Sequence, residues 1–179
     1  MNSDDVCRVL LSEGEINDIV TSLAEKINRD YLGKEIILVG LLKGSVVFMA
    51  DLMRKITVPC SVDFIAASSY GNSTVSSGCV KISKDLSLDI KDRHVLIVED
   101  IIDSGITLSS LMGILRERKP ASIKLCSFVS KPSRRVKNVN IDYLGAEIPD
   151  EFVVGYGLDY AEKYRNLPYL CVLKPEVYI

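Results

Sequence analysis

The stretch of sequence that decides the fold is Val95-Leu96-Ile97-Val98-Glu99-Asp100-Ile101-Ile102-Asp103-Ser104-Gly105-Ile106-Thr107-Leu108. Residues 94–98 are mostly apolar, which predicts a buried strand. Two adjacent carboxylates, Glu99 and Asp100, follow it directly. Apolar residues then recur at helical spacing, which predicts a helix over residues 107–119. The stretch therefore combines a strand, an acidic turn and a helix in immediate succession.

Strand and helix patterns alternate on both sides of this stretch. Ser12-Glu13-Gly14-Glu15 has the spacing of a capping box and opens an amphipathic helix. A continuous apolar run predicts a buried strand at residues 36–42, and further strands are expected at about residues 61–67 and at residues 123–129. This alternation favours an α/β fold with a parallel sheet, whose ligands bind beyond the carboxyl ends of the strands. Function is therefore expected at Lys43-Gly44, in the polar loop at residues 68–78, and after residue 98.

Bulk composition excludes several classes of function. The chain has 179 residues, of which 47% are apolar and 26% charged, with a formal net charge of -2. This balance gives no support to broad binding of nucleic acid or of an acidic membrane surface. No apolar run is long enough to span a bilayer, and the charged first residues predict no secretory signal. The five cysteines are scattered without a Cys-x-x-Cys pair, so we expect no zinc site and a cytoplasmic location.

The residues after the central strand combine carboxylates with an anion-binding turn. Glu99 and Asp100 can accept hydrogen bonds from hydroxyl groups. The turn from Asp103 to Thr107 offers backbone N–H groups at a helix N-terminus, where anions bind, and Gly105 permits close approach of the backbone. The carboxylates would repel a bound phosphate unless they address hydroxyls of the same ligand, as in a sugar phosphate. The alternative is a plain strand-to-helix turn with solvated acids and a Ser or Thr cap.

The whole stretch resembles the phosphoribosyl-pyrophosphate motif of the type I phosphoribosyltransferases. The resemblance covers the apolar strand, the acidic pair and the turn. It implies that Glu99 and Asp100 hold the ribose hydroxyls, directly or through Mg²⁺. It also implies that the 5-phosphate lies on Asp103, Ser104, Gly105, Ile106 and Thr107. Ile106 departs from the pattern, because some members have Lys there, so the phosphate must rely on backbone amides and hydroxyls.

Further segments, in the same order along the chain, are similar to those of the hypoxanthine-guanine phosphoribosyltransferases. Leu42-Lys43-Gly44-Ser45 resembles their pyrophosphate-binding loop, and Ser69-Tyr70-Gly71 resembles the start of their flexible active-site loop. Residues 147–160, continuing through 164–167, resemble their purine-binding segment. The resemblance implies the type I phosphoribosyltransferase fold, a central mainly parallel sheet flanked by helices with a small hood lobe. It also implies a single domain over residues 1–179, with a core of about 30–140 and a hood formed by the chain termini.

The resemblance also assigns roles in binding the base. Lys131 would hydrogen-bond the purine 6-oxo group, Phe152 would stack on the base, and the Val153 backbone would meet its edge. The plainer alternatives are a solvated loop lysine at position 131 and a core aromatic side chain at position 152.

Other roles concern the metal and the leaving group. Asp159 would ligate Mg²⁺ together with the acidic pair, and Arg165 would contact pyrophosphate with Lys43 and Gly44. The Leu42-Lys43 peptide would be cis. A surface ion pair between Asp159 and Arg165 is the alternative.

The implied reaction is a purine salvage transfer. Hypoxanthine or guanine would displace pyrophosphate from 5-phosphoribosyl 1-pyrophosphate and give IMP or GMP, with Mg²⁺ as cofactor. Asp103 would accept the purine N7 proton as general base, and the loop at residues 68–78 would close over the site. We expect a homo-oligomer, either a dimer or a tetramer. Two alternatives stay open: a regulator that senses the activated sugar while controlling RNA or DNA, and an enzyme for xanthine or another oxopurine.

Overall fold

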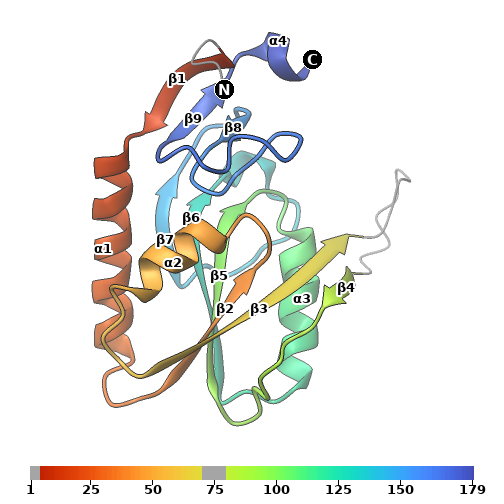
Figure 1. Cartoon of the computed structure of the whole chain (residues 1–179). Coiled ribbons are helices and arrows are strands. Elements are labelled where there is room, and N and C mark those ends of the chain that lie inside the picture. The colour runs from red at the N-terminus through yellow and green to blue at the C-terminus, as the bar shows by residue number, and fades with distance from the viewer. Residues whose placement is uncertain (1–4, 70–79) are drawn as a thin grey trace.

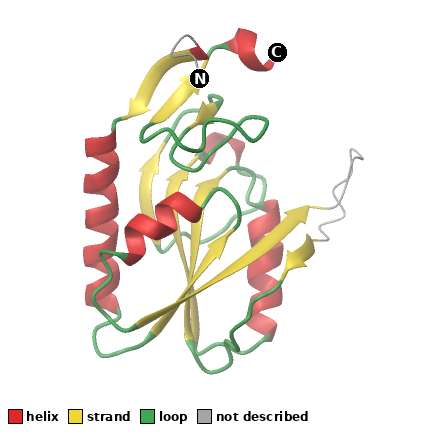
Figure 2. Cartoon of the chain, in the orientation of Figure 1, coloured by secondary structure: helices red, strands yellow, loops and turns green. Residues whose placement is uncertain are grey.

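The structure, a computed structural model, describes residues 5–69 and 80–179 (Figures 1 and 2). Its elements are β1 (Val6–Leu11), α1 (Glu13–Asp30), β2 (Ile36–Leu41), α2 (Val46–Met53), β3 (Cys60–Ser69), β4 (Val80–Lys84), β5 (His94–Ile102), α3 (Ile106–Glu117), β6 (Ser122–Ser130), η2 (Pro132–Arg134), β7 (Tyr143–Glu147), β8 (Val153–Val154), β9 (Leu170–Leu173) and α4 (Pro175–Tyr178). The predicted capping box opens α1, because the Ser12 hydroxyl accepts from the Glu15 N–H and the Glu15 carboxylate accepts from the Ser12 N–H.

The central sheet has six strands in the order β4-β3-β2-β5-β6-β7. Neighbours from β3 to β7 are parallel, and β4 pairs antiparallel with β3 at one edge. Helices α1 and α2 pack on one face and α3 on the other (Figure 2). The prediction of an α/β fold with a mainly parallel sheet flanked by helices is confirmed.

The two central strands, β2 and β5, are covered on both faces. Leu38 and Leu96 join the core beneath α1 and α2, whereas Val39 and Ile97 join the core beneath α3. Successive side chains of a strand point to opposite faces, so burial on both sides requires a continuous apolar run. Polar side chains therefore follow only at the carboxyl ends of β2 and β5, beyond the helices that cover the two faces of the sheet.

A second, antiparallel sheet has the order β1-β9-β8 and brings the two ends of the chain together. A small core of its own contains Val154, Tyr164, Cys171 and Leu173. In Figure 1 this sheet lies above the carboxyl ends of the central strands. The loops of the two sheets thus face each other, which places a site between them.

The structure changes one boundary that matters for function. β5 continues to Ile102 instead of ending at residue 98. Ile101 and Ile102 continue the pairing with β6, opposite Val129 and Ser130. Glu99 and Asp100 therefore lie on the strand itself, where neighbouring strands fix their direction.

Part of the predicted polar loop lies outside the described residues. Ser68 and Ser69 end β3, whereas Tyr70 and the rest of the segment to Gly78 fall outside. Of the helices that the structure describes, none combines the length and the apolar character needed to cross a membrane.

Candidate active site

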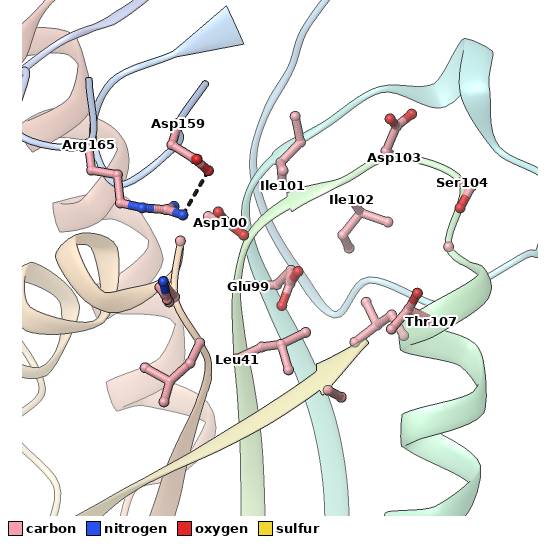
Figure 3. A pocket seen from close by; sticks show the side chains of 16 residues that line it. Leu41, Glu99, Asp100, Ile101, Ile102, Asp103, Ser104, Thr107, Asp159 and Arg165 are labelled. Atoms are coloured by element: carbon pink, nitrogen blue, oxygen red, sulfur yellow. Dashed lines mark ion pairs between the residues drawn. The ribbon is translucent and has the colours of Figure 1, made fainter. Parts of the chain in front are cut away.

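A cavity of about 350 Å³ opens at the carboxyl ends of β2 and β5. Its lining residues are Leu41, Leu42, Lys43, Gly44, Ala67, Glu99, Asp100, Ile101, Ile102, Asp103, Ser104, Gly105, Thr107, Leu108, Asp159 and Arg165. Figure 3 shows how charge is distributed in it. The acidic pair lies in the middle, with Arg165 and Asp159 on one side and the turn bearing Asp103 on the other.

The acidic pair lies in a poorly solvated place. Only 8% of Asp100 is exposed, and burial raises the pKa of its carboxyl to about 6. Burial, followed by the neighbouring Asp100 carboxylate, raises the pKa of Glu99 well above its ordinary value. Glu99 Oε2 is buried and has no hydrogen-bond partner among the described residues. A carboxyl oxygen without a donor beside a cavity suits a ligand that brings a donor, such as a hydroxyl group.

The loop after β2 packs its backbone against this pair. The Leu42-Lys43 peptide is cis, as predicted. A Cβ on Gly44 would lie 1.7 Å from Asp100 Oδ2, so no larger residue fits without displacing the carboxylate. A Cβ on Gly157 would lie 2.1 Å from the Gly44 carbonyl oxygen. The close approach of these glycines brings the loop of β2 and the loop after β8 to one wall of the cavity.

Two cations lie at this wall. Arg165 Nη2 is 2.8 Å from Asp159 Oδ1, and Arg165 Nη1 donates to the Gly157 carbonyl at 2.8 Å. Figure 3 draws the Arg165–Asp159 ion pair beside Asp100. The pair therefore lines the cavity, whereas the alternative placed it on the general surface. Lys43 Nζ is 3.1 Å from each carboxylate oxygen of Glu162.

The turn between β5 and α3 has the shape of an anion site. Gly105 is the N-cap residue of α3, with φ of 76°, and it has no side chain with which to cap the helix. The Ile106 N–H donates to the Ser104 hydroxyl at a long 3.4 Å. Val136 and Lys137 donate their N–H groups to the Ser104 carbonyl at 2.9 and 3.0 Å, which fixes the turn. The weakly satisfied N–H groups at the start of a helix carry the partial positive charge that anions prefer.

Asp103 lies at the start of the turn beside a residue that the sequence did not single out. Arg134 Nε is 3.2 Å from Asp103 Oδ1, and Arg134 Nη1 is 3.4 Å from Asp150 Oδ1. Asp103 Oδ1 has no aligned hydrogen bond within residues 5–69 and 80–179. The ion pair with Arg134 thus holds the Asp103 carboxylate at the edge of the cavity.

Two of the three residues predicted to bind a purine, Lys131 and Phe152, line a second cavity, of about 510 Å³. Lys131 is 6% exposed, and its Nζ donates to the Glu151 carbonyl at 2.7 Å, which excludes a solvated loop lysine. The Phe152 ring stacks on Tyr178, with centroids 4.6 Å apart, and meets Tyr160 edge to face. Phe152 is therefore partly buried against neighbouring rings and also lines this cavity, so it is not an enclosed core side chain.

The structure brings most of the predicted residues to the first cavity and separates a few from it. Lys131 and Phe152 line the second cavity instead. Val153 lies in β8, where it pairs with Val172, and neither Val153 nor Ile106 lines either cavity. Sequence reasoning missed Glu162, Arg134 and Tyr178, because their contacts with Lys43, Asp103 and Phe152 join distant parts of the chain. It also missed Ile101 and Ile102, which an apolar pair between two acidic groups could have indicated.

Asp100→Asn is expected to stabilise the free protein at pH 8. The pKa of Asp100 is about 6 in the folded state, against an ordinary value of 3.8, so ionisation of the buried carboxyl opposes folding as the pH rises through this window. The cost above pH 6 is about 1–3 kcal/mol. Asn keeps the size of the side chain without the charge. Thermal denaturation should give the variant the higher Tm at pH 8, with the difference shrinking between pH 6 and 4. A difference independent of pH would contradict this.

Comparisons with known proteins agree with the geometry of the site. The model of the phosphoribosyl transferase domain matches residues 10–161. The hypoxanthine-guanine phosphoribosyltransferase of Bacillus subtilis (strain 168) is 52% identical over 178 residues, covering 99% of both chains. The bifunctional protein TilS/HprT of Listeria monocytogenes serotype 4b is 49% identical over 98% of this chain, which spans 27% of the length of that relative.

Solved structures give the same picture. A crystal structure of a hypoxanthine phosphoribosyltransferase from Staphylococcus aureus superposes with a TM-score of 0.96 and 48% sequence identity, covering 100% of this chain and 99% of the other. A hypoxanthine-guanine phosphoribosyltransferase from Bacillus anthracis, with a HEPES molecule in its active site, superposes with a TM-score of 0.91 and 47% identity over 94% of this chain and 99% of the other. The chain therefore belongs to the hypoxanthine-guanine phosphoribosyltransferase family, within the wider family of phosphoribosyl transferase domains.

Proposed function

We propose that the chain transfers the 5-phosphoribosyl group of 5-phosphoribosyl 1-pyrophosphate to hypoxanthine or guanine, releasing pyrophosphate and forming IMP or GMP for purine salvage. The distribution of charge in the first cavity carries this proposal. An uncapped helix start lies at one end, two carboxylates lie in the middle, and two cations lie at the other end. The activated sugar has the complementary order: a 5-phosphate, two ribose hydroxyls and a diphosphate.

The two anionic ends of the substrate would have separate sites. The 5-phosphate would lie on the turn formed by Asp103, Ser104, Gly105, Ile106 and Thr107. Because Ile106 supplies no cation, backbone N–H groups and two hydroxyls would bind the phosphate, supported by the helix dipole. Lys43, Gly44 and Arg165 would bind the diphosphate at the opposite wall, and their charge would stabilise it as it leaves.

The carboxylates suit Mg²⁺ when substrate is present. Within residues 5–69 and 80–179, no group of three or more His, Cys, Asp or Glu side chains is arranged to hold a metal ion. Mg²⁺ commonly binds through one or two carboxylates, with substrate phosphates and water completing its shell, so the donors present fit this ion. Glu99, Asp100 and Asp159 would hold it with the substrate's oxygens. Bound there, the ion would neutralise charge on the departing diphosphate.

The base would be oriented by residues of the second cavity and activated by Asp103. Lys131 would donate to the purine 6-oxo group, Phe152 would stack on the ring, and the Val153 backbone would meet the base edge. Asp103 would accept the N7 proton as the ring nitrogen attacks ribose C1, which prevents positive charge from building up on the base.

We also propose an organisation for the whole chain: one domain in a cytoplasmic protein, with a core of about residues 30–140 and a hood formed by the termini.

The surface of α2 supports a homo-oligomer, a dimer or a tetramer. Val46, Ala50 and Met53 recur along one side of this helix and are exposed. Such an apolar face suits a contact with a second copy of the chain. Light scattering coupled to size-exclusion chromatography should give two or four times the mass of one chain. The mass of a single chain would reject the proposed oligomer.

Product analysis tests the proposed reaction. Hypoxanthine, 5-phosphoribosyl 1-pyrophosphate and Mg²⁺ should give IMP, identified by chromatography and mass, together with one equivalent of pyrophosphate. A chelator should stop product formation, and renewed Mg²⁺ should restore it. Release of free ribose 5-phosphate without nucleotide would reject the transfer to a base.

Gly44→Ala should weaken use of the activated sugar, because the added Cβ would lie 1.7 Å from Asp100 Oδ2 and one of the two groups must move. A misplacement of this size predicts a rise of about tenfold or more in KM for 5-phosphoribosyl 1-pyrophosphate, or a similar fall in kcat/KM. Gly113→Ala is the matched control, since nothing lies within 4 Å of a Cβ at that position in α3. The control should keep wild-type kinetics and gain a little stability, up to about 1 kcal/mol. Wild-type kinetics in Gly44→Ala would show that the close packing of Gly44 against Asp100 does not matter for substrate use.

A further inference from the structure

One carboxylate engages both cations of the proposed diphosphate site. Glu162 Oε1 and Oε2 each lie 3.1 Å from Lys43 Nζ, and Glu162 Oε2 is 3.6 Å from Arg165 Nη2. Lys43 follows β2 and Arg165 follows β8, so the two cations come from different elements of the fold. Hydrogen bonds from Lys43 lower the pKa of Glu162, because the ammonium group favours the anionic carboxylate.

The backbone around Glu162 holds the carboxylate in this place. Ala161 and Glu162 have positive φ, of 50° and 63°, within a tight turn closed by hydrogen bonds between Tyr160 and Lys163. The Glu162 N–H donates to Asp159 Oδ2 at 2.9 Å, which links the turn to the carboxylate that pairs with Arg165. The Glu162 and Lys43 side chains are each 66% exposed, so their contact lies at the rim of the cavity and breaks at little cost.

We propose that the Glu162 carboxylate takes the place of a diphosphate oxygen between Lys43 and Arg165 in the free protein, and that it competes there with the diphosphate of the substrate and with product pyrophosphate. The inference rests on the proposed function, which assigns these two cations to the diphosphate. An incoming anion displaces a side chain that can swing into solvent, and the same side chain returns when pyrophosphate leaves. Glu162 thereby limits the affinity of the site and keeps its cations paired between turnovers.

Calorimetric titration with magnesium pyrophosphate provides the test, on the wild-type chain and on Glu162→Gln at low ionic strength. The variant should bind about three- to fivefold more tightly, and the gain should shrink as salt screens the exposed charges. Glu35→Gln is the matched control, because it removes one exposed carboxylate from an ion pair with Arg93 and changes the net charge equally. Glu35 lies before β2, at the opposite end of that strand from Lys43, so the control should bind like the wild type.

A second variant tests whether the change in binding comes from loss of the charge or from distortion of the turn at residues 160–163. Glu162→Asn is also neutral, and Asn tolerates positive φ, so it should reproduce the tighter binding. In steady-state kinetics both variants should lower KM for 5-phosphoribosyl 1-pyrophosphate without raising kcat, because the same cations hold the product. Unchanged or weaker pyrophosphate binding in both variants would overturn the inference alone. Failure of the wild type to bind magnesium pyrophosphate would overturn the proposed function and the inference together.

Discussion

Asp103→Asn should lower kcat by about 10²-fold or more, the usual range for loss of a general acid–base group. The carboxylate directly follows β5, lines the first cavity, and is held there by its ion pair with Arg134. Asn preserves the size of the side chain but does not accept the N7 proton. Initial rates of IMP formation at saturating substrates measure the effect, and IMP affinity should change much less than kcat.

Asp150→Asn is the matched control for this experiment. Arg134 pairs with both carboxylates: its Nη1 is 3.4 Å from Asp150 Oδ1 and its Nε is 3.2 Å from Asp103 Oδ1. Substitution of Asp150 therefore disturbs the ion pairs of Arg134 without changing Asp103, the proposed general base. We expect kcat within about threefold of the wild type, as for the loss of one exposed ion pair. Full activity in Asp103→Asn would remove Asp103 from the mechanism. An equal loss in both variants would assign the effect to Arg134.

Lys131→Ala should abolish the use of 6-oxopurines without creating use of adenine. Lys131 can donate hydrogen bonds but cannot accept one, so it matches a carbonyl oxygen and opposes an amino group. A site built around such a polar group discriminates by about 10⁴-fold, because the wrong base leaves the group unpaired. Phe152 cannot supply this choice, since stacking tolerates any purine.

The burial of Lys131 requires a second variant. Its Nζ also donates to the partly buried Glu151 carbonyl, so removal of the buried side chain leaves that acceptor unpaired and creates a void. Lys131→Met keeps much of the volume and lacks the donor, so it should lose oxopurine activity while staying folded by circular dichroism. The measured quantity is kcat/KM for hypoxanthine and adenine. Substantial hypoxanthine activity in Lys131→Met would reject the role of the ammonium group.

The central layers of the fold follow from the sequence, and the hood strands do not. β2 and β5 are buried on both faces, so their continuous apolar runs identify them without knowledge of their partners. β1 has no fully buried residue, and it forms because β9, from the other end of the chain, pairs with it. No local pattern records such a pairing. For the same reason, the end of β5 is fixed by pairing of Ile101 and Ile102 with β6.

The candidate site divides in the same way. The acidic pair and the turn are contiguous in sequence, so residue types and spacing alone predict an anion site beside carboxylates. Glu162, Arg134 and Tyr178 act through contacts with Lys43, Asp103 and Phe152, which are far from them in the chain. Their side chains have no distinctive spacing. Only the folded structure brings them to the site.

The most direct test of the proposed activity is a spectrophotometric comparison of four bases under one set of conditions. Wild-type protein, Mg²⁺ and 5-phosphoribosyl 1-pyrophosphate are mixed in turn with hypoxanthine, guanine, xanthine and adenine, and nucleotide formation is followed by absorbance. Rapid conversion of hypoxanthine or guanine, with adenine poorer by about 10⁴-fold in kcat/KM, is the expected result. Use of adenine within about tenfold of hypoxanthine, or no nucleotide from any 6-oxopurine, would contradict it.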